Sequence, residues 1–318
     1  MDFAGSKFGR TCKLSLETQP DAYGLTQNIT IPDGLTIEFS INRQSLSSAQ
    51  TAQFRIYGLA PGTRDNVYKD RFDLTQYRAL QFSAGYQTFM PMIFNGQIFQ
   101  AYSEKNREES VTIIDAFDGG PMISNGFSNT CTGGSVLQDT AGDVIARLMA
   151  TLPGIKGEPV VGKFPTTNTN MRGEVLCGNT WDLIRQKTGG NCAIVNGRPY
   201  ALNLTDAILN DRITDLRLAS ANDKSIPVIS SDTGMIGAPK RSGMLVEWDM
   251  LFEPRLRLFQ IVNIQSAFNK KFNGPAKVMG FQHKGIVSKT VIGDYTTTAS
   301  FIFAKGLTAA QVASVLTG

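Results

Sequence analysis

The sequence has little of what most metal sites and catalytic sites need. Its 318 residues include one histidine, His283, so a zinc site with two or three histidine ligands would need other ligand types. The four cysteines are Cys12, Cys131, Cys177 and Cys192, and no two of them form a C-x-x-C pair. In a chain of this length they do not indicate a disulfide framework, so we expect free thiols in a reducing cytoplasm.

Charge and long apolar runs are also scarce. Lys and Arg number 31 against 27 Asp and Glu, and a net charge of +4 is too small for a dedicated nucleic-acid binder. With 42% hydrophobic and 18% charged residues the chain is expected to fold rather than stay disordered. The longest uncharged stretch, 119–138, is rich in Gly, Ser, Asn and Thr, which predicts a loop and no membrane insertion. The N-terminus lacks the pattern of a secretory signal.

The first 120 residues are predicted to be mostly strands. Apolar and polar residues alternate over 35–42, and the same period of two recurs over 52–56 and 80–86. Residues 111–117 form a further β-rich run, and a short helix is predicted over 63–69 with Thr63 as its N-cap. Repeated short strands with turns between them favour a barrel or sandwich.

Residues 121–206 are predicted to form a small α/β insert. A helical stripe of apolar residues runs through 136–152, and a second helix is predicted to start at Thr180 as N-cap and to stop at Gly189. Asn196-Gly197 between two apolar runs predicts a tight hairpin.

The last third, 207–318, returns to a strand pattern. Strands are predicted over 244–250, 256–264, 276–281 and 296–303. A closing helix is predicted over 308–316, and its apolar stripe is our candidate partner-docking surface: Ala309, Val312, Ala313 and Leu316.

A three-residue echo connects the two β-rich thirds. Phe94-Asn95-Gly96 and Phe272-Asn273-Gly274 share one sequence, and each is predicted to precede a strand. The echo is short, but it fits two related β units around an insert. The expected organisation is therefore mainly β, with barrels over 1–120 and 207–318 flanking an α/β domain over 121–206.

The sequence offers few candidates for catalytic chemistry. A Ser–His–Asp enzyme would have to use His283, but no G-x-S-x-G motif is there to present the nucleophilic serine, so a structural role of His283 is favoured. Asp115 and Asp118 could form an acid–base pair, but an odd spacing places them on opposite faces of a strand. The stretch 157–163 approaches a phosphate-binding loop but continues with Phe where Ser or Thr is needed, so a plain loop is predicted. Residues 178–184 are similar to the opening of a peptidoglycan-binding module, and Trp181 within them is the first residue to test for sugar binding. No catalytic residue, metal ligand or cofactor is predicted.

The order of these pieces resembles the baseplate hub proteins of tailed bacteriophages. The pieces that carry the resemblance lie at residues 35–41, 51–59, 63–69, 84–86, 93–98, 101–103, 114–119, 234–239 and 278–285.

This resemblance implies a structural, non-enzymatic protein of the virion. Hub subunits resemble duplicated tail-tube modules around an inserted domain, and three of them form a ring of pseudo-sixfold symmetry. Such a ring joins the tail tube to the central spike at the tail tip. The implied partners are two further copies of the chain, the tail-tube protein, the spike and other baseplate proteins. The tape-measure protein and DNA would only pass through the lumen, and assembly would take place in the cytoplasm of the host bacterium.

Two alternatives stay open from the sequence. One is a cell-wall-binding or peptidoglycan-degrading tail module, and the other is a tail-tube or tail-completion subunit.

Overall fold

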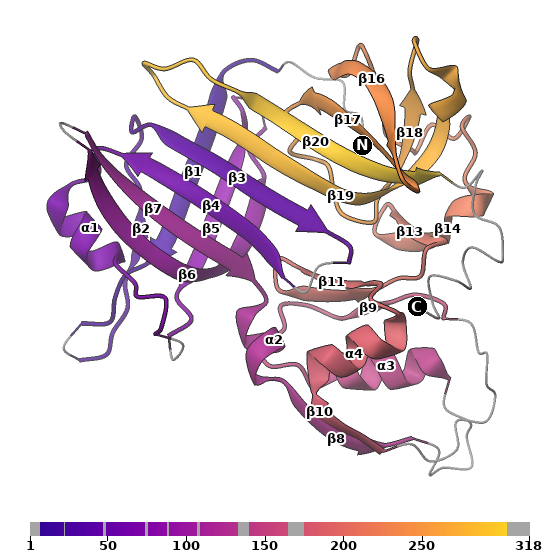
Figure 1. The fold of residues 1–318 in the computed structure, drawn as a ribbon, viewed down its shortest axis with the longest axis horizontal. Helices are drawn as coiled ribbons and strands as arrows, with labels where there is room; N and C mark the ends of the chain where they lie inside the picture. Colours follow the sequence, from indigo (N-terminus) through magenta and orange to yellow (C-terminus); the bar gives the residue numbers. More distant parts are fainter. Residues whose placement is uncertain are drawn as a thin grey trace.

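The computed structural model describes residues 7–21, 23–46, 49–73, 76–87, 89–106, 109–132, 140–164 and 175–303. Within these ranges the chain is mainly β, which confirms the expected class. The predicted helix over 308–316 lies outside them. Figure 1 shows two β-rich parts side by side, with a helix-containing part packed below one of them.

The first part of the chain contains seven strands and one helix. These are β1 (Arg10–Glu17), β2 (Asn28–Thr30), β3 (Ile37–Gln44), β4 (Gln50–Tyr57), α1 (Pro61–Val67), β5 (Ala79–Tyr86), β6 (Met92–Asn106) and β7 (Glu109–Asp118).

The middle part mixes helices with short strands. They are α2 (Gly120–Asn125), β8 (Phe127–Cys131), α3 (Ala141–Ala150), β9 (Val160–Val161), β10 (Val175–Asn179), α4 (Thr180–Thr188), β11 (Cys192–Val195) and β12 (Arg198–Ala201).

The last part returns to strands, with two short 3-10 helices. These elements are β13 (Asp206–Leu209), β14 (Arg212–Asp215), η1 (Leu216–Leu218), β15 (Val228–Ser230), β16 (Met235–Ser242), β17 (Leu245–Leu251), β18 (Ile261–Gln265), η2 (Lys270–Phe272), β19 (Gly274–Val287) and β20 (Tyr295–Phe303).

The two β-rich parts repeat one topology. Neighbouring strands follow the order β3-β4-β7-β6-β5 in the first part and β16-β17-β20-β19-β18 in the last part. In both, a hairpin comes first in the sequence, one strand follows, and a long hairpin then inserts between them. Both long hairpins also shift register, between Ile98 and Gln100 in β6 and between Val278 and Gly280 in β19. We call these five-strand sets the first unit and the second unit.

The sequence echo that suggested two related units is not itself equivalent in space. Phe94 lies inside β6, five residues before the shifted residue Phe99. Phe272 lies in η2, seven residues before Met279, which occupies the matching place in β19. The expectation that both copies precede a strand is therefore wrong for the first copy, and the duplication rests on topology.

Strand β19 joins the two units into one hydrogen-bonded sheet. Its first residues, Gly274–Lys277, pair with β18 of its own unit. Its later residues, Gly280–Val287, pair with β3 of the first unit. The ladder therefore continues from one unit into the other through a single strand, as Figure 1 shows for β19 and β3.

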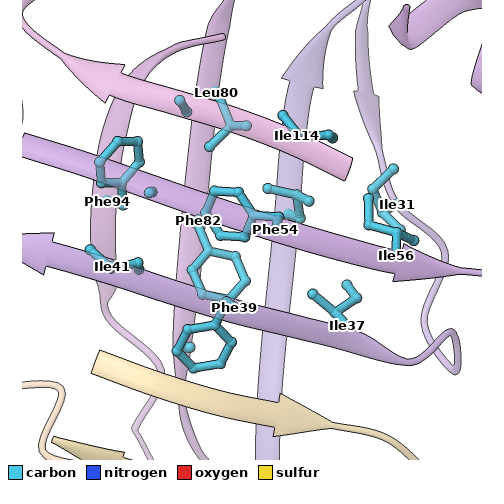
Figure 2. Close-up of a cluster of buried hydrophobic side chains, with 14 of the residues drawn as sticks. Ile31, Ile37, Phe39, Ile41, Phe54, Ile56, Leu80, Phe82, Phe94 and Ile114 are labelled. Carbon is cyan, nitrogen blue, oxygen red and sulfur yellow. The ribbon is translucent and has the colours of Figure 1, made fainter. Parts of the chain in front are cut away.

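The core of the first unit explains why its strands alternate. Every second residue of β3 and β4 is buried, and inward-facing side chains from β5, β6 and β7 meet them. Figure 2 shows Phe39, Phe54, Phe82 and Phe94 pointing into one cluster. In the described residues no ladder pairs β1 with β3, and aromatic side chains of the last part fill this side of the core: Phe252 and Tyr295.

Local corrections concern caps and the predicted loop. The N-cap of α1 is Ala60, so Thr63 lies inside that helix, and the N-cap of α4 is Asn179, whose side chain accepts a hydrogen bond from the N–H of Asp182. The stretch 119–138 contains α2 and β8, because small polar residues are compatible with a short helix and a strand when buried neighbours cover them. The run 256–264 becomes a strand only from Ile261.

Other local predictions agree with the structure. Helix α3 buries Val144, Ile145, Leu148 and Met149 on one stripe, and the Asn196-Gly197 turn joins β11 to β12. The expected domain boundaries at residues 120 and 206 remain a prediction.

Candidate functional site

His283 is buried in the core. Its Nδ1 lies 2.7 Å from the hydroxyl oxygen of Thr297. Burial, together with the smaller effect of nearby Arg43, lowers the pKa of His283 to about 3. The imidazole therefore stays neutral in the core, consistent with the structural role favoured from the sequence.

Asp115 and Asp118 do not form a pair. Asp115 lies on the outer face of β7 and accepts hydrogen bonds from Gln53, at 2.8 Å, and Gln100, at 2.5 Å. Asp118 points inward and contacts Arg43, whose Nη1 lies 3.0 Å from its Oδ2. The two carboxylates thus have separate partners, as the odd spacing predicted.

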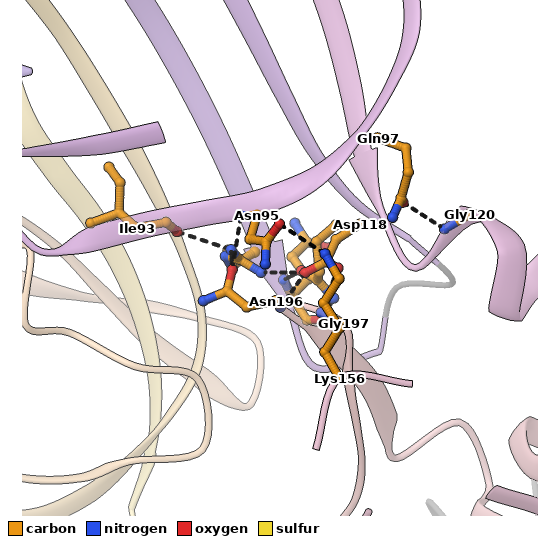
Figure 3. A network of polar contacts seen from close by, with 11 residues as sticks. Ile93, Asn95, Gln97, Asp118, Gly120, Lys156, Asn196 and Gly197 are labelled. Carbon is orange, nitrogen blue, oxygen red and sulfur yellow. Dashed lines mark hydrogen bonds and ion pairs between the residues drawn. The ribbon is translucent and has the colours of Figure 1, made fainter. Parts of the chain in front are cut away.

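The buried pair of Arg43 and Asp118 forms the junction between the first unit and the middle part. The carboxylate of Asp118 accepts the N–H groups of Asn196 and Gly197, the latter at 2.9 Å. Arg43 donates through Nη2 to the side-chain oxygen of Asn196 at 2.6 Å and to the carbonyl of Ile93 at 2.9 Å. Figure 3 shows this network converging on the β11–β12 turn.

The turn is shaped to meet that carboxylate. Asn196 and Gly197 have φ angles of 54° and 78°, the left-handed region that two-residue hairpin turns require. Both N–H groups then point at Asp118, while the amide oxygen of Asn196 also accepts the N–H of Asn95 at 3.1 Å. Lys156 adds a contact of 3.2 Å to the side chain of Asn95.

In the junction, the partners of each charged group oppose the effect of burial on its pKa. Burial raises the pKa of Asp118, and Arg43 with the N–H groups of Asn196 and Gly197 opposes that rise. Burial lowers the pKa of Arg43, and Asp118 opposes that change. Three donors bond to the carboxylate of Asp118 and stabilise its ionised form. A buried carboxylate without partners would instead be strongly destabilising.

A second buried cation connects the middle part to the second unit. Lys277 of β19 is 1% exposed and donates to the carbonyl of Asn203 at 2.7 Å. Its ammonium also lies 5.2 Å from the ring centroid of Phe259. Burial lowers the pKa of Lys277 to about 7, and Asp206 partly opposes this. The middle part therefore contacts each β unit through a buried basic side chain, Arg43 in the first unit and Lys277 in the second.

Two strand edges are open for pairing. In the described residues β16 has a ladder only with β17, and the outer part of β6 has one only with β7 apart from the bridge between Ala101 and Lys69. Such edges present unpaired N–H and C=O groups to another chain. Glu104 and Lys240 are exposed on these two strands.

Trp181 is not an exposed aromatic, so it cannot present a sugar-binding face. Its side chain is 0% exposed and packs in the core between α3 and α4. The interpretation of Trp181 as a ligand contact is therefore wrong, because the N-terminal turn of α4 faces inward. The candidate docking stripe Ala309, Val312, Ala313 and Leu316 lies outside the described residues.

No group of three His, Cys, Asp or Glu side chains able to hold a metal ion occurs in the ranges that the structure describes. In those same ranges, no helix is both long enough and apolar enough to cross a bilayer.

The duplicated five-strand units and the inserted α/β part define a recognisable fold class. No protein-family model matches the chain, and no curated protein matches it. Solved structures do match. A tail protein from Neisseria meningitidis MC58 has a TM-score of 0.52 at 11% identity, over 94% of this chain and 99% of that chain.

Other solved structures give the same result. The 43 kDa tail protein of prophage MuSo2 from Shewanella oneidensis matches with a TM-score of 0.50 at 8% identity, over 93% of this chain and 98% of that chain. The E. coli c3393 protein, a type VI secretion component described as similar to the T4 tail proteins gp27 and gp5, matches with a TM-score of 0.53 at 9% identity, over 93% and 80%. The chain thus has the fold of phage tail proteins and related secretion components, which confirms at the level of fold the resemblance to baseplate hubs.

Sequence reasoning missed the junction residues for a physical reason. Arg43 sits in an alternating strand where a charged residue suggests the solvent side, yet it points inward. Asp118 directly precedes two glycines, which is ordinary at the end of a strand and gives no signal of its contacts with Arg43 or with the β11–β12 turn.

Proposed function

We propose that this protein is a structural tail hub whose three copies close a ring of six similar β units, between the tail tube and the spike. The observation that carries the proposal is the duplicated strand order joined through β19 and β3. A chain with two like units can occupy two adjacent positions of a six-position ring, and three chains complete it.

The contact between units within the chain supplies a template for contacts between chains. The first edge strand of the first unit, β3, pairs with the outer half of β19. The corresponding strands are β16 of the second unit and the outer half of β6 of the first unit. In the described residues β16 has a ladder only with β17, and the part of β6 beyond its bridge at Ala101 has one only with β7. Pairing β16 of one copy with β6 of the next would therefore repeat the internal contact and close a heterologous ring.

Residues that pair across neighbouring strands form a row, and comparing equivalent rows of the two units gives the register of this contact. Ser40, Gln53, Asp115 and Gln100 form one row across the first unit. Lys240, Glu247, Ser300 and Gly280 form the corresponding row of the second unit.

The internal contact then predicts a specific pair across the ring interface. Ser40 pairs with Lys284, which is four residues beyond Gly280. The equivalent of Ser40 is Lys240, and the residue four beyond Gln100 is Glu104. Lys240 therefore faces Glu104 of the neighbouring copy, an opposite-charge pair on one face of the sheet.

The outer face of the shared sheet suits a channel through which DNA passes. The two rows carry four polar uncharged side chains, two carboxylates and one lysine, and Asp115 accepts hydrogen bonds from Gln53 and Gln100. DNA-binding surfaces gain affinity from many Lys and Arg contacts to phosphate, and these rows do not offer them. A channel lined by this face would let a polyanion slide without holding it.

The test combines solution mass with a charge exchange. Light scattering over a range of concentrations, alone and after co-expression with the neighbouring tail proteins, is expected to give three times the 34.6 kDa chain mass. Lys240→Glu and Glu104→Lys should each shift the distribution toward monomer, and the double exchange should restore the trimer. Lys224→Glu, an exposed lysine outside both edges, is the matched control.

Two outcomes would count against parts of the proposal. A monomer under every condition, co-expression included, contradicts the hub assignment. A trimer that is insensitive to both charge reversals places the interface elsewhere than β16 and β6. The docking role proposed for the stripe over 309–316 is tested separately by deleting residues 307–318, where unchanged assembly contradicts it.

A further inference from the structure

A cleft of about 580 Å³ opens where the three parts of the chain meet, and the proposed ring does not use it. Its walls come from the β5–β6 turn of the first unit, the β11–β12 hairpin of the middle part, and the segments 208–211 and 254–260 of the last part. The volume lies within the range of sites that enclose a ligand or several side chains of a partner. Arg43, whose guanidinium is paired with Asp118, is one of the residues that line the cleft.

The rim of the cleft is cationic. Lys156, Arg198, Arg255 and Arg257 all line it, and Asp211 is the one carboxylate among its described lining residues. Asp211 forms an ion pair with Arg257 at 3.0 Å, so the charge of one of the four cations is already balanced. Arg43 does not add to the excess, because Asp118 balances it.

Two of these cations have no carboxylate partner among the residues that the structure describes. Lys156 donates to the amide oxygen of Asn95 and Arg198 donates to the carbonyl of Glu158, so both have neutral acceptors. The guanidinium carbon of Arg198 also lies 5.6 Å from the ring centroid of Tyr200. Because Arg198 uses its Nε for the carbonyl of Glu158, its two Nη groups can form a two-pronged bond to a carboxylate.

We propose that this cleft binds an acidic segment of a partner protein, with its carboxylates on Lys156 and Arg198. Between the cations the side walls of the cleft are apolar, and these parts include Phe89, Pro254 and Leu256. A segment that alternates acidic and apolar side chains would satisfy both surfaces. Because all walls belong to one chain, the site does not depend on ring formation.

The test uses a fluorescein-labelled hexaglutamate peptide and follows its anisotropy on addition of the full-length protein. Binding is expected at low salt, with loss of about ten-fold or more in affinity when Lys156 and Arg198 are both changed to Glu. The matched control is Lys270→Glu with Lys271→Glu, the same change of charge at two exposed lysines that do not line the cleft. Hexaglutamine, which has the same length and no charge, should not bind.

Two outcomes decide against the proposal. Equal loss of binding in the control variant means that the peptide responds to overall charge and not to the cleft. Failure of hexaglutamate to bind, with tripolyphosphate binding in its place, assigns the cleft to a phosphate ligand. If the reversed variant loses its folded circular dichroism spectrum, the neutral variant Lys156→Gln with Arg198→Gln replaces it. Binding by a monomeric protein separates this result from failure of the proposed ring.

Discussion

Arg43 and Asp118 face each other across β4, with Nη1 and Oδ2 3.0 Å apart and both side chains buried. The pair joins two strands that are not neighbours in the sheet, and it presents a carboxylate to the hairpin turn of the middle part. One ion pair therefore fixes both the end of β7 and the position of Asn196.

Removing one member of this pair should be costly. Arg43→Met leaves an unpaired carboxylate in the core, and Asp118→Leu leaves an unpaired guanidinium, so each is expected to lower the free energy of unfolding by about 3–5 kcal/mol. Urea denaturation followed by circular dichroism measures this. The double variant should lose less than the sum of the two, because neither charge is then left alone.

The exposed pair of Arg217 and Asp215 serves as the matched comparison. Its Nη2 and Oδ2 atoms lie 2.6 Å apart at the surface, where solvent screens the charges, so Arg217→Ala is expected to change the free energy of unfolding far less than Arg43→Met does. A loss at Arg43 as small as that at Arg217 would contradict the role assigned to the buried junction.

His283 should make the protein less stable in acid. Its folded-state pKa of about 3 lies below the ordinary value of 6.5, so the unfolded chain binds the extra proton first as the pH falls. The stability contributed by the neutral imidazole is complete above pH 6.5 and declines toward pH 3, at about 1.4 kcal/mol per pH unit. In urea titrations at several pH values, the free energy of unfolding of His283→Gln should fall less between pH 6.5 and pH 3 than that of the wild type. An equal fall in the variant and the wild type would disprove the assignment.

Lys277 should act in the alkaline range. Its folded-state pKa of about 7 lies below the ordinary 10.5, so stability should rise as the pH increases from 7 to 10.5. Lys277→Met removes the need to bury an amine, and we expect it to be more stable than the wild type by about 1 kcal/mol or more at pH 7. That advantage should shrink toward pH 10, and thermal melts at both pH values measure it. An advantage independent of pH would mean that packing, not charge, decides the effect.

The four thiols should divide into two reactivity classes. Cys131 and Cys177 are exposed on neighbouring strands, so they are expected to alkylate rapidly at pH 7.5. Burial raises the pKa of Cys12 to about 12 and that of Cys192 to about 11, which keeps both as slow thiols. Mass spectrometry after brief iodoacetamide treatment should show two additions, and Cys131→Ser with Cys177→Ser should remove both. Rapid modification at Cys192 would show that the core between α3 and α4 opens readily.

Alternation in the sequence predicted the strands well because burial on one face of a sheet leaves a period of two. The pattern over 35–42 became β3, and that over 52–56 became part of β4. What the pattern could not give was the pairing of distant strands, such as β3 with β19, because register between segments over 200 residues apart leaves no local trace. The prediction of Thr180 as a helix N-cap was wrong because Asn179 offers an equally suitable side chain one position earlier.

The junction was hidden by the same limit. An arginine in an alternating strand and an aspartate before two glycines are each ordinary locally, and only the fold brings Arg43 and Asp118 together. Trp181 shows the reverse case, because a residue type common at binding surfaces turned out to be a packing residue.

Strand β19 of the second unit is hydrogen-bonded to β3 of the first unit, so the two units share one continuous sheet. Tilting one unit against the other would break the backbone hydrogen bonds of Gly280–Val287 with β3. The angle between neighbouring units is therefore set within a single folded chain. In an assembly built by repeating that contact, the curvature of the whole ring would be set inside each subunit before any two subunits meet.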